Sequence, residues 1–199
     1  MDKEILIEIL KRKISDPHVL WLIEEIIRSN PRGIPIGNLT SQLFANVYLN
    51  ELDHYVKRVL KEKYYIRYMD DFLILGTDKK KLADDREKMK IFLREKLKLV
   101  LHPKKSEIFP IDPSTFLDYA RNKALGAGKG IDFLGYVLKD GKRYLRKDTV
   151  KRFIKKKKKY SAKLRSGKIS AEDMKRVDTS WRGYAKFADS YMLMKKMGI

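Results

Sequence analysis

Residues 64–75 constrain the fold more than any other stretch, because two β-favouring runs enclose a pair of acidic residues. Tyr and Ile dominate the first run, and Phe, Ile and Leu the second. The pattern predicts a tight β-hairpin with Asp70 and Asp71 at its tip. Asp is also common in ordinary turns, so the pair alone indicates little about function. The aromatic and apolar strands on both sides favour a metal site over an ordinary turn.

The chemistry of such a site follows from its oxygen ligands. Two adjacent carboxylates repel each other, and a cation beside them favours their ionised forms. Hard oxygen ligands suit Mg²⁺ or Mn²⁺. Two such ions held about 4 Å apart can stabilise both the attacking and the leaving oxygen of a phosphoryl transfer. We therefore expect Asp70 and Asp71 to be catalytic metal ligands.

The charge of the chain indicates its partners. The formal net charge is +20, from 46 basic and 26 acidic residues, which favours nucleic acid first and an anionic membrane surface second. Residues 148–199 hold 16 Lys and Arg but only five Asp and Glu. No apolar run approaches the roughly 20 residues that span a bilayer, so we expect no membrane partner. The absence of Cys excludes disulfides and thiolate metal sites, and it fits the cytoplasmic location that we expect.

Apolar residues spaced three or four apart predict that most of the chain is helical. We expect caps at Asp16 and Asp148, and a capping box formed by Ser170 and Asp173. The Asp140-Gly141 pair predicts a hairpin between two strands. The expected helices cover residues 2–14, 17–30, 39–61, 78–97, 148–164 and about 170–191. The expected strands, besides the acidic hairpin, cover residues 97–101, 133–138 and 143–146.

These elements indicate an α+β fold with an antiparallel sheet and packed helices, followed by an all-α basic part. The change of character near Arg146 predicts two domains, residues 1–146 and 147–199. Trp181, Tyr184 and Tyr191 stand at helical spacing, so we expect them in the core of the second domain.

The order of these elements, together with four motifs, resembles the palm and thumb of a reverse transcriptase. Tyr68-Met69-Asp70-Asp71 is similar to the Tyr-x-Asp-Asp box of that family. The other three motifs resemble the loop and helix before the box, the lysine motif after it and the primer-grip hairpin: Gly37-Asn38-Leu39-Thr40-Ser41-Gln42, His102-Pro103-Lys104-Lys105-Ser106 and Phe133-Leu134-Gly135-Tyr136.

The loop narrows the resemblance to one lineage. Retroviral and group II intron enzymes usually carry Gln-Gly-x-x-x-Ser-Pro, whereas this chain carries Ile36-Gly37 followed by Ser41-Gln42. That version is typical of reverse transcriptases from diversity-generating retroelements, and residues 180–185 resemble the thumb of the same lineage. The resemblance implies copying of template RNA into cDNA with frequent errors at adenines, and a small basic accessory protein. A group II intron maturase is the lesser alternative, because Gln42 stands where Pro is expected.

One departure from the family concerns the first catalytic aspartate. In the family it lies on a strand directly before a helix like residues 2–14, and here that strand and the fingers would precede Met1. We therefore expect an N-terminally truncated enzyme that is inactive by itself and self-associates through its uncovered face. The alternative from another functional class is a polymerase-derived module that binds a primer–template duplex without catalysis.

The resemblance also implies roles for individual residues. In the intact enzyme, the aspartate of that first strand and one of the Asp70-Asp71 pair hold two Mg²⁺ or Mn²⁺ ions, and we expect Asp70 to be the main ligand of the pair and Asp71 a secondary one. A glycine lets the backbone approach a ligand closely, and a helix start offers free N–H groups to phosphate, although an ordinary loop and cap would look the same. The expected contacts to dNTP and template are Gly37, Asn38, Ser41, Gln42, Tyr68, Met69, Lys104 and Lys105.

Two further sets of residues complete the expected nucleic-acid site. Leu134, Gly135 and Tyr136 are expected to form the primer grip. A helix with almost no acidic residues to balance its basic ones is expected to follow the phosphate backbone of the RNA template and of a DNA or RNA primer. The residues expected to do so are Lys151, Arg152, Lys155, Lys156, Lys158, Lys159, Lys163 and Arg165.

Overall fold

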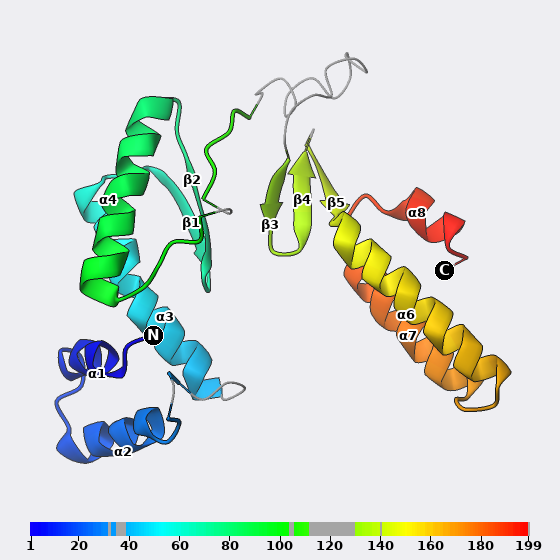
Figure 1. Cartoon of the computed structure of the whole chain (residues 1–199), viewed down its shortest axis with the longest axis horizontal. Helices are drawn as coiled ribbons and strands as arrows, with labels where there is room; N and C mark the ends of the chain where they lie inside the picture. Colours follow the sequence, from blue (N-terminus) through cyan, green and yellow to red (C-terminus); the bar gives the residue numbers. More distant parts are fainter. Residues whose placement is uncertain (32, 35–38, 104–105, 112–129, 140, 199) are drawn as a thin grey trace. The chain divides into compact units, whose positions relative to one another are not determined.

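The structure is a computed structural model that describes residues 1–31, 33–34, 39–103, 106–111, 130–139 and 141–198 (Figure 1). The chain divides into two compact units, Met1–Ile108 and Phe109–Ile199. Helices dominate both units and each contains a small antiparallel sheet, which agrees with the predicted α+β class. The expected domain boundary at residue 146 was drawn from the change from a mixed to an all-helical pattern, and it stays a prediction.

Two capped helices open the first unit. The carboxylate of Asp2 accepts backbone N–H groups at the start of α1 (Lys3–Lys11), and Asp16 does the same for α2 (Pro17–Arg28). Pro17 occupies the first helical position, where its missing N–H costs no hydrogen bond. Among the apolar residues of α2 only Ile27 is fully buried, and Val19 is exposed.

The third helix, α3 (Leu39–His54), continues directly into one π-helical turn, η1 (Tyr55–Val59). Together they agree with the helix predicted over residues 39–61. Its buried face includes Phe44, Tyr48, Leu52 and Val56, whereas Leu43 is exposed. The Tyr48 hydroxyl donates a 2.5 Å hydrogen bond to the carbonyl of Leu97. A fully buried tyrosine thus ties α3 to the end of α4 (Lys79–Leu97).

The acidic hairpin is present as predicted. Strand β1 (Tyr64–Tyr68) pairs antiparallel with β2 (Asp71–Leu75), and Tyr68 lies opposite Asp71. Alternate residues, Tyr65, Phe72 and Ile74, pack on the helical core. In Figure 1 the hairpin accordingly lies beside α4. Within the part of the chain that the structure describes, neither strand pairs with a third.

The predicted strand over residues 97–101 is wrong. Leu97 is the last residue of α4, and Lys98 ends the helix in the left-handed conformation with φ of +50°. The N–H of Leu99 then bonds back to the carbonyl of Leu93 at 2.9 Å, as at many helix ends. Leu99 and Leu101 still pack against the core, so their apolar character reflects burial beside a helix end and not a sheet.

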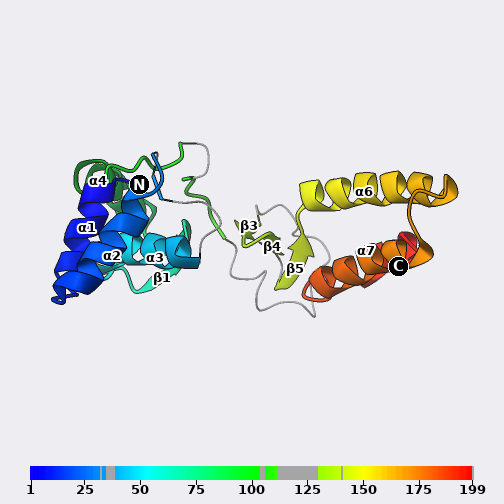
Figure 2. The same ribbon diagram turned by 90° about the horizontal axis from the view of Figure 1, so that it is seen from below.

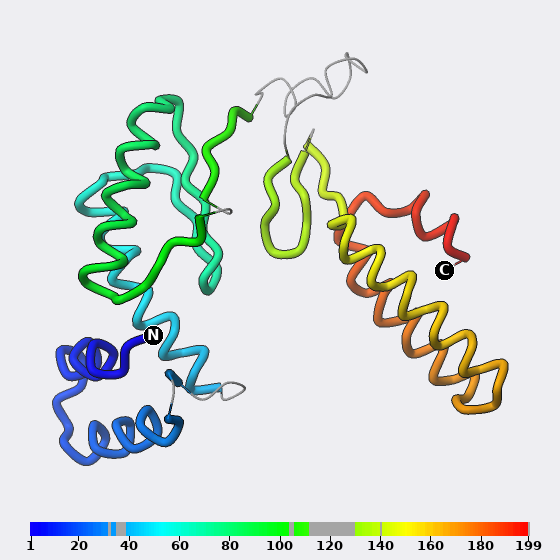
Figure 3. The backbone as a smooth tube through the Cα atoms, viewed as in Figure 1, coloured from blue at the N-terminus to red at the C-terminus, as the bar shows by residue number. Residues whose placement is uncertain are grey.

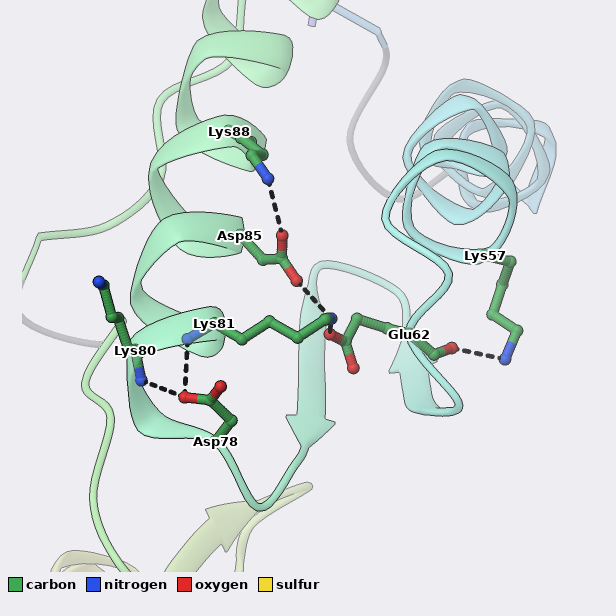
Figure 4. A network of polar contacts seen from close by, with 7 residues as sticks. All are labelled: Lys57, Glu62, Asp78, Lys80, Lys81, Asp85 and Lys88. Atoms are coloured by element: carbon green, nitrogen blue, oxygen red, sulfur yellow. Dashed lines mark hydrogen bonds and ion pairs between the residues drawn. The ribbon is translucent and has the colours of Figure 1, made fainter.

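A polar network fastens the first turns of α4 to the segment after η1 (Figure 4). Lys81 bridges two buried carboxylates, those of Glu62 and Asp85, and its Nζ lies 2.8 Å from Oδ2 of Asp85. Burial favours a raised pKa for Asp85, but the hydrogen bond and the charge of Lys81 outweigh it and hold this pKa below its usual value. The buried carboxylate of Asp85 is therefore charged and paired with Lys81.

In the described part of the second unit, three antiparallel strands precede the helices, β3 (Ile131–Phe133), β4 (Tyr136–Lys139) and β5 (Lys142–Leu145). The predicted single strand over residues 133–138 is wrong, because a two-residue turn at Leu134 and Gly135 divides it. The second predicted hairpin is confirmed by the pairing of Lys139 with Lys142.

Three helices follow, α6 (Lys147–Arg165), α7 (Ala171–Ala185) and α8 (Tyr191–Lys196). Figures 2 and 3 show the chain reversing after α6, so that α7 returns alongside it. The predicted capping box of Ser170 and Asp173 is confirmed. Asp148 does not cap α6, since the N-cap residue is Arg146 and Asp148 lies in the first turn.

A small aromatic core joins α6 and α7 to the sheet. The rings of Phe153 and Trp181 stack with centroids 4.0 Å apart, and Leu145 of β5 and Ala185 complete the buried cluster. The expected helix through residue 191 instead stops at Ala185, whose carbonyl accepts a 2.7 Å hydrogen bond from the hydroxyl of Ser190. Tyr191 is 69% exposed, so its expected burial is wrong. None of the helices among the described residues is long and apolar enough to cross a membrane.

Candidate active site and nucleic-acid interface

The acidic turn is the centre of the candidate active site. Because Tyr68 pairs with Asp71, Met69 and Asp70 alone form the turn, and Asp71 is the first residue of β2. Both Asp side chains are exposed. Met69 has φ of +54°, in the left-handed region that glycine favours and side chains disfavour. Something else in the structure must therefore hold this turn in place.

Arg67 supplies that support from behind the turn. Its Nη1 donates to the carbonyl oxygen of Met69 at 2.8 Å and to Oδ1 of Asn46 at 3.0 Å. Its Nε and Nη2 donate to the two carboxylate oxygens of Asp53 at 2.7 and 2.6 Å. Asn46 and Asp53 both belong to α3, so the guanidinium connects the turn to that helix.

The electrostatics of this cluster keep it charged. Burial favours a raised pKa for Asp53, yet hydrogen bonds from Arg67 and Tyr65, together with the charge of Arg67, hold that pKa below its usual value. Burial, and then the 2.7 Å hydrogen bond to Asp53, raise the pKa of the Tyr65 hydroxyl. Arg67 and Asp53 thus form an ion pair whose side chains are only 10% and 25% exposed.

Sequence reasoning missed these supporting residues, although one signal could have found them. Tyr65 and Arg67 alternate with Tyr64, Ile66 and Tyr68 along β1, and the face bearing Tyr65 packs on the core. Strand periodicity therefore places the Arg67 guanidinium on the inward face, where a charge needs a partner. The identity of the partner, Asp53, could not be read from that periodicity.

The turn offers suitable ligands for a divalent cation, though only two. Exposed carboxylate oxygens are the donors that Mg²⁺ and Mn²⁺ prefer, so Asp70 and Asp71 fit the type of metal expected. Among the described residues no group of three or more His, Cys, Asp or Glu side chains lies close enough to hold an ion. Further oxygens would have to come from water, from substrate or from protein outside the described part.

The expected nucleotide contacts are distributed unevenly. Ser41 is buried on α3, whereas Gln42 is exposed one helical turn before Asn46 and therefore shares its side of the helix. The amide of Asn46 lies 3.3 Å from the sulfur of Met69, so this side of α3 faces the turn. Tyr68 is exposed at the end of β1. Four of the expected residues lie outside the described part of the chain: Gly37, Asn38, Lys104 and Lys105.

The expected primer grip forms the turn between β3 and β4 and is held by α7. The Tyr184 hydroxyl donates to the carbonyl of Gly135 at 2.9 Å, and the Tyr136 hydroxyl donates to the carbonyl of Tyr184 at 3.1 Å. The two tyrosine rings stack with centroids 5.2 Å apart. Leu134 has φ of +52° and is 42% exposed. Tyr184, expected only in the core, therefore also fixes this turn.

The basic helix α6 exposes most of its charge. Its sequence contains ten Lys and Arg but only Asp148 as an acid. The sole expected contact that is half-buried is Lys163, and the exposed ones are Lys151, Arg152, Lys155, Lys156, Lys158, Lys159 and Arg165. Lys157, in the middle of the lysine run, instead pairs with Asp178 of α7 at 3.4 Å. The helix thus has one side fixed to α7 and a broad basic surface elsewhere.

A comparison with protein families decides what these features mean together. The family model described as reverse transcriptase (RNA-dependent DNA polymerase) matches residues 21–138. The chain belongs to the reverse transcriptase family. The matched region contains the acidic hairpin and the β3–β4 turn, whereas the basic helix α6 lies beyond it. No curated protein matches the chain.

Membership explains the acidic turn and the charge of the chain. Reverse transcriptases generally use divalent metal ions, and they bind a nucleic-acid template, a primer and dNTPs. An exposed pair of aspartates on a hairpin, in a chain with a net charge of +20, agrees with both requirements.

Proposed function

We propose that this chain is the palm and thumb portion of a reverse transcriptase of the diversity-generating retroelement type. In the intact enzyme it would carry out RNA-directed DNA synthesis by two-metal nucleotidyl transfer. The observation that carries the proposal is the exposed Asp70-Asp71 pair, fixed at a hairpin turn by the ion pair of Arg67 and Asp53. Residues 1–146 would belong to the palm and residues 147–199 to the thumb.

Asp70 is the main metal ligand in this proposal and Asp71 the second. When bound, divalent ions act as Lewis acids on the primer 3′ hydroxyl and neutralise the departing pyrophosphate. Ser41 and Gln42, of which Gln42 is exposed, contact the nascent base pair. Tyr68 contacts dNTP or template, and Met69 lies beside the primer end. Lys104 and Lys105 neutralise the triphosphate or protonate pyrophosphate.

Leu134, Gly135 and Tyr136 place the primer terminus, and the exposed lysines and arginines of α6 follow the phosphate backbone. Such binding releases counterions, so affinity for a primer–template duplex should fall steeply as salt increases. Replacing Lys155 and Lys156 with Gln should lessen that salt dependence. Replacing the exposed Lys90 and Lys96 of α4 with Gln changes the charge equally and serves as the control. Equal salt slopes for both variants would argue against α6 as the binding surface.

Metal binding by the chain alone should be weak, because its turn supplies two carboxylates. Calorimetric titration with Mn²⁺ should give heat for the wild type that Asp70→Ala abolishes. The exposed Asp84 on α4 provides a matched control, since Asp84→Ala removes the same charge from the same unit. Equal heats from wild type and Asp70→Ala would end the metal assignment.

The second candidate function is a module that binds primer–template without catalysis. The absence of a third metal-ligating side chain near the turn, among the residues that the structure describes, favours it. Primer extension on an RNA template separates the candidates. Extension only after addition of fingers and a further aspartate-bearing strand would support the polymerase portion. Duplex binding without extension in either form would support the module.

The lineage depends on Gln42, which stands where retroviral and group II intron enzymes have Pro. This substitution would loosen base selection, because an exposed flexible amide replaces a rigid ring beside the nascent pair. A full-length enzyme carrying Gln42→Pro should make fewer errors at template adenines. Unchanged error rates would count against a role of Gln42 in base selection. A small basic accessory protein is the partner expected for the retroelement type.

Several large apolar side chains of the first unit are exposed, among them Trp21, Leu39 and Ile66. Because exposed apolar area of this kind drives association, we expect the chain by itself to self-associate. Light scattering at increasing concentration should show a rising mean mass. A constant monomer mass would count against self-association.

A further inference from the structure

The backbone of the acidic turn is in an unfavourable conformation. Only Met69, the first of its two central residues, has positive φ, which is the sign pattern of a hairpin turn that favours Gly at that position. A non-glycine residue in this conformation is strained, and the conformation persists only when its surroundings enforce it. The surroundings of Met69 are therefore expected to contain the group that enforces it.

We propose that Arg67, anchored by Asp53 and assisted by Asn46, is a positioning residue that fixes the geometry of the Asp70-Asp71 turn. We call these three residues the turn clamp. Its consequence for metal binding rests on the proposed function, whereas its effect on the turn does not. The clamp touches the backbone of Met69 and leaves both Asp side chains exposed, so it acts on the metal ligands through the turn.

The shape of the guanidinium suits this task. Arginine presents its donors in a rigid planar fork, whereas lysine is a flexible point charge. Here Nε and Nη2 are taken by the carboxylate of Asp53, which sets the plane and direction of the group. That leaves Nη1 aimed at the carbonyl of Met69 and the side-chain oxygen of Asn46. Lysine in its place could supply the charge but not four contacts in one plane.

The clamp also relates the turn to the helix that carries the expected nucleotide contacts. Asn46 and Asp53 are two turns apart on α3, and Gln42 lies one turn before Asn46 on the same side. Asn46 contacts both Arg67 and the sulfur of Met69. A shift of the turn would thus break contacts to α3. The distance between the acidic pair and Gln42 is accordingly fixed by Arg67.

The test measures the turn directly in the full chain without metal. Amide hydrogen exchange from Tyr68 to Asp71 should become about tenfold faster in Arg67→Lys, as expected when a single net hydrogen bond of about 1.4 kcal/mol is lost. Amides in the centre of α1 report global opening in the same sample. Arg94→Lys, at an exposed site on α4, is the matched control and should leave all rates unchanged.

A second measurement connects the turn to the metal. Paramagnetic broadening of the Asp70 and Asp71 signals by Mn²⁺ should require about tenfold more Mn²⁺ in Arg67→Lys, because residues that orient metal ligands typically contribute at least that factor. If Arg67→Lys does not fold, Asn46→Ala removes an exposed member of the clamp and replaces it in both measurements.

The outcomes separate the clamp from the proposed function. Unchanged exchange at the turn in a folded variant would overturn the clamp, whatever Mn²⁺ does. Faster exchange with unchanged Mn²⁺ affinity would overturn its role toward the metal. If the wild type shows no broadening by Mn²⁺, the metal assignment fails, and the exchange rates still decide whether Arg67 fixes the turn.

Discussion

Two hairpin turns, one in each unit, contain a non-glycine residue in the left-handed conformation, and different contacts stabilise each turn. Each has two residues, and each begins with a residue other than Gly in the left-handed region, Met69 at +54° and Leu134 at +52°. In the first turn a charged fork from the strand itself, Arg67, grips the Met69 carbonyl. In the second a tyrosine from a helix, Tyr184, grips the carbonyl of Gly135.

The difference indicates what each turn tolerates. The clamp around Arg67 is electrostatic and directional, so it depends on the ionisation of Asp53 and leaves the turn side chains free to face solvent. The Tyr184 hydroxyl, in contrast, packs closely against Gly135, since a Cβ on Gly135 would lie 2.8 Å from the tyrosine oxygen. The first turn thus needs a charge behind it, and the second needs a glycine within it.

Asp53→Asn should produce the largest effect, a loss of about 3 kcal/mol in the unfolding free energy of the first unit, because it leaves Arg67 largely buried and unpaired. Urea denaturation followed by the amide signals of the first unit measures it. A double-mutant cycle with Arg67→Met should recover part of the loss, since the uncompensated charge is then gone. Strict additivity in that cycle would show that the two residues are not coupled.

Gly135→Ala should destabilise the second unit by about 2 kcal/mol, because positive φ and the clash with Tyr184 act together. Gly167→Ala separates the two causes, since Gly167 has φ of +68° but nothing lies within 4 Å of its missing Cβ. That control should cost only the conformational part, about 1 kcal/mol. Thermal unfolding of the second unit provides the comparison, and equal losses for both variants would rule out the clash.

Tyr184→Phe should cost about 1 kcal/mol, because it removes one hydrogen bond to Gly135 and keeps the ring stacked on Tyr136. Tyr191→Phe, at an exposed tyrosine, is the control and should be neutral. The change should also relieve the clash in Gly135→Ala, so the double variant should be more stable than the sum of the two losses. Additive losses would mean that the Tyr184 hydroxyl does not clash with the Cβ introduced at position 135.

The smallest expected effect is a pH dependence of amide hydrogen exchange at the first turn, which the second turn should lack. The pKa of Asp53 is lower in the folded chain, so its contribution is complete above the unfolded value of about 3.9 and is lost as pH falls through the folded value. Amide exchange near Met69, corrected for intrinsic rates, should therefore rise below about pH 4, while exchange near Leu134 should not. Asp53→Asn should abolish the difference. The pKa of Asp85 is also lowered in this unit, and any acid dependence of exchange that remains in Asp53→Asn measures its contribution.

Much of this fold was predictable because its signals are local. The capping box of Ser170 and Asp173, and Asp16 followed by Pro17, start helices within one turn of chain. The failures are also informative. Residues 97–101 and 133–138 are short apolar runs, whose periodicity cannot distinguish a strand from a buried helix end or a divided hairpin. Burial of Leu97 and the turn at Leu134 decided both cases.

The sequence by itself determined the acidic hairpin, the basic charge of α6 and membership in the reverse transcriptase family, because each of these depends on residue type and near spacing. Only the tertiary structure decided which residues hold the two turns. Asp53 is 14 positions from Arg67, and Tyr184 is 49 positions from Gly135. Such partners meet because α3 and α7 pack beside their hairpins, and no periodicity within a single element specifies which side chains that packing brings together.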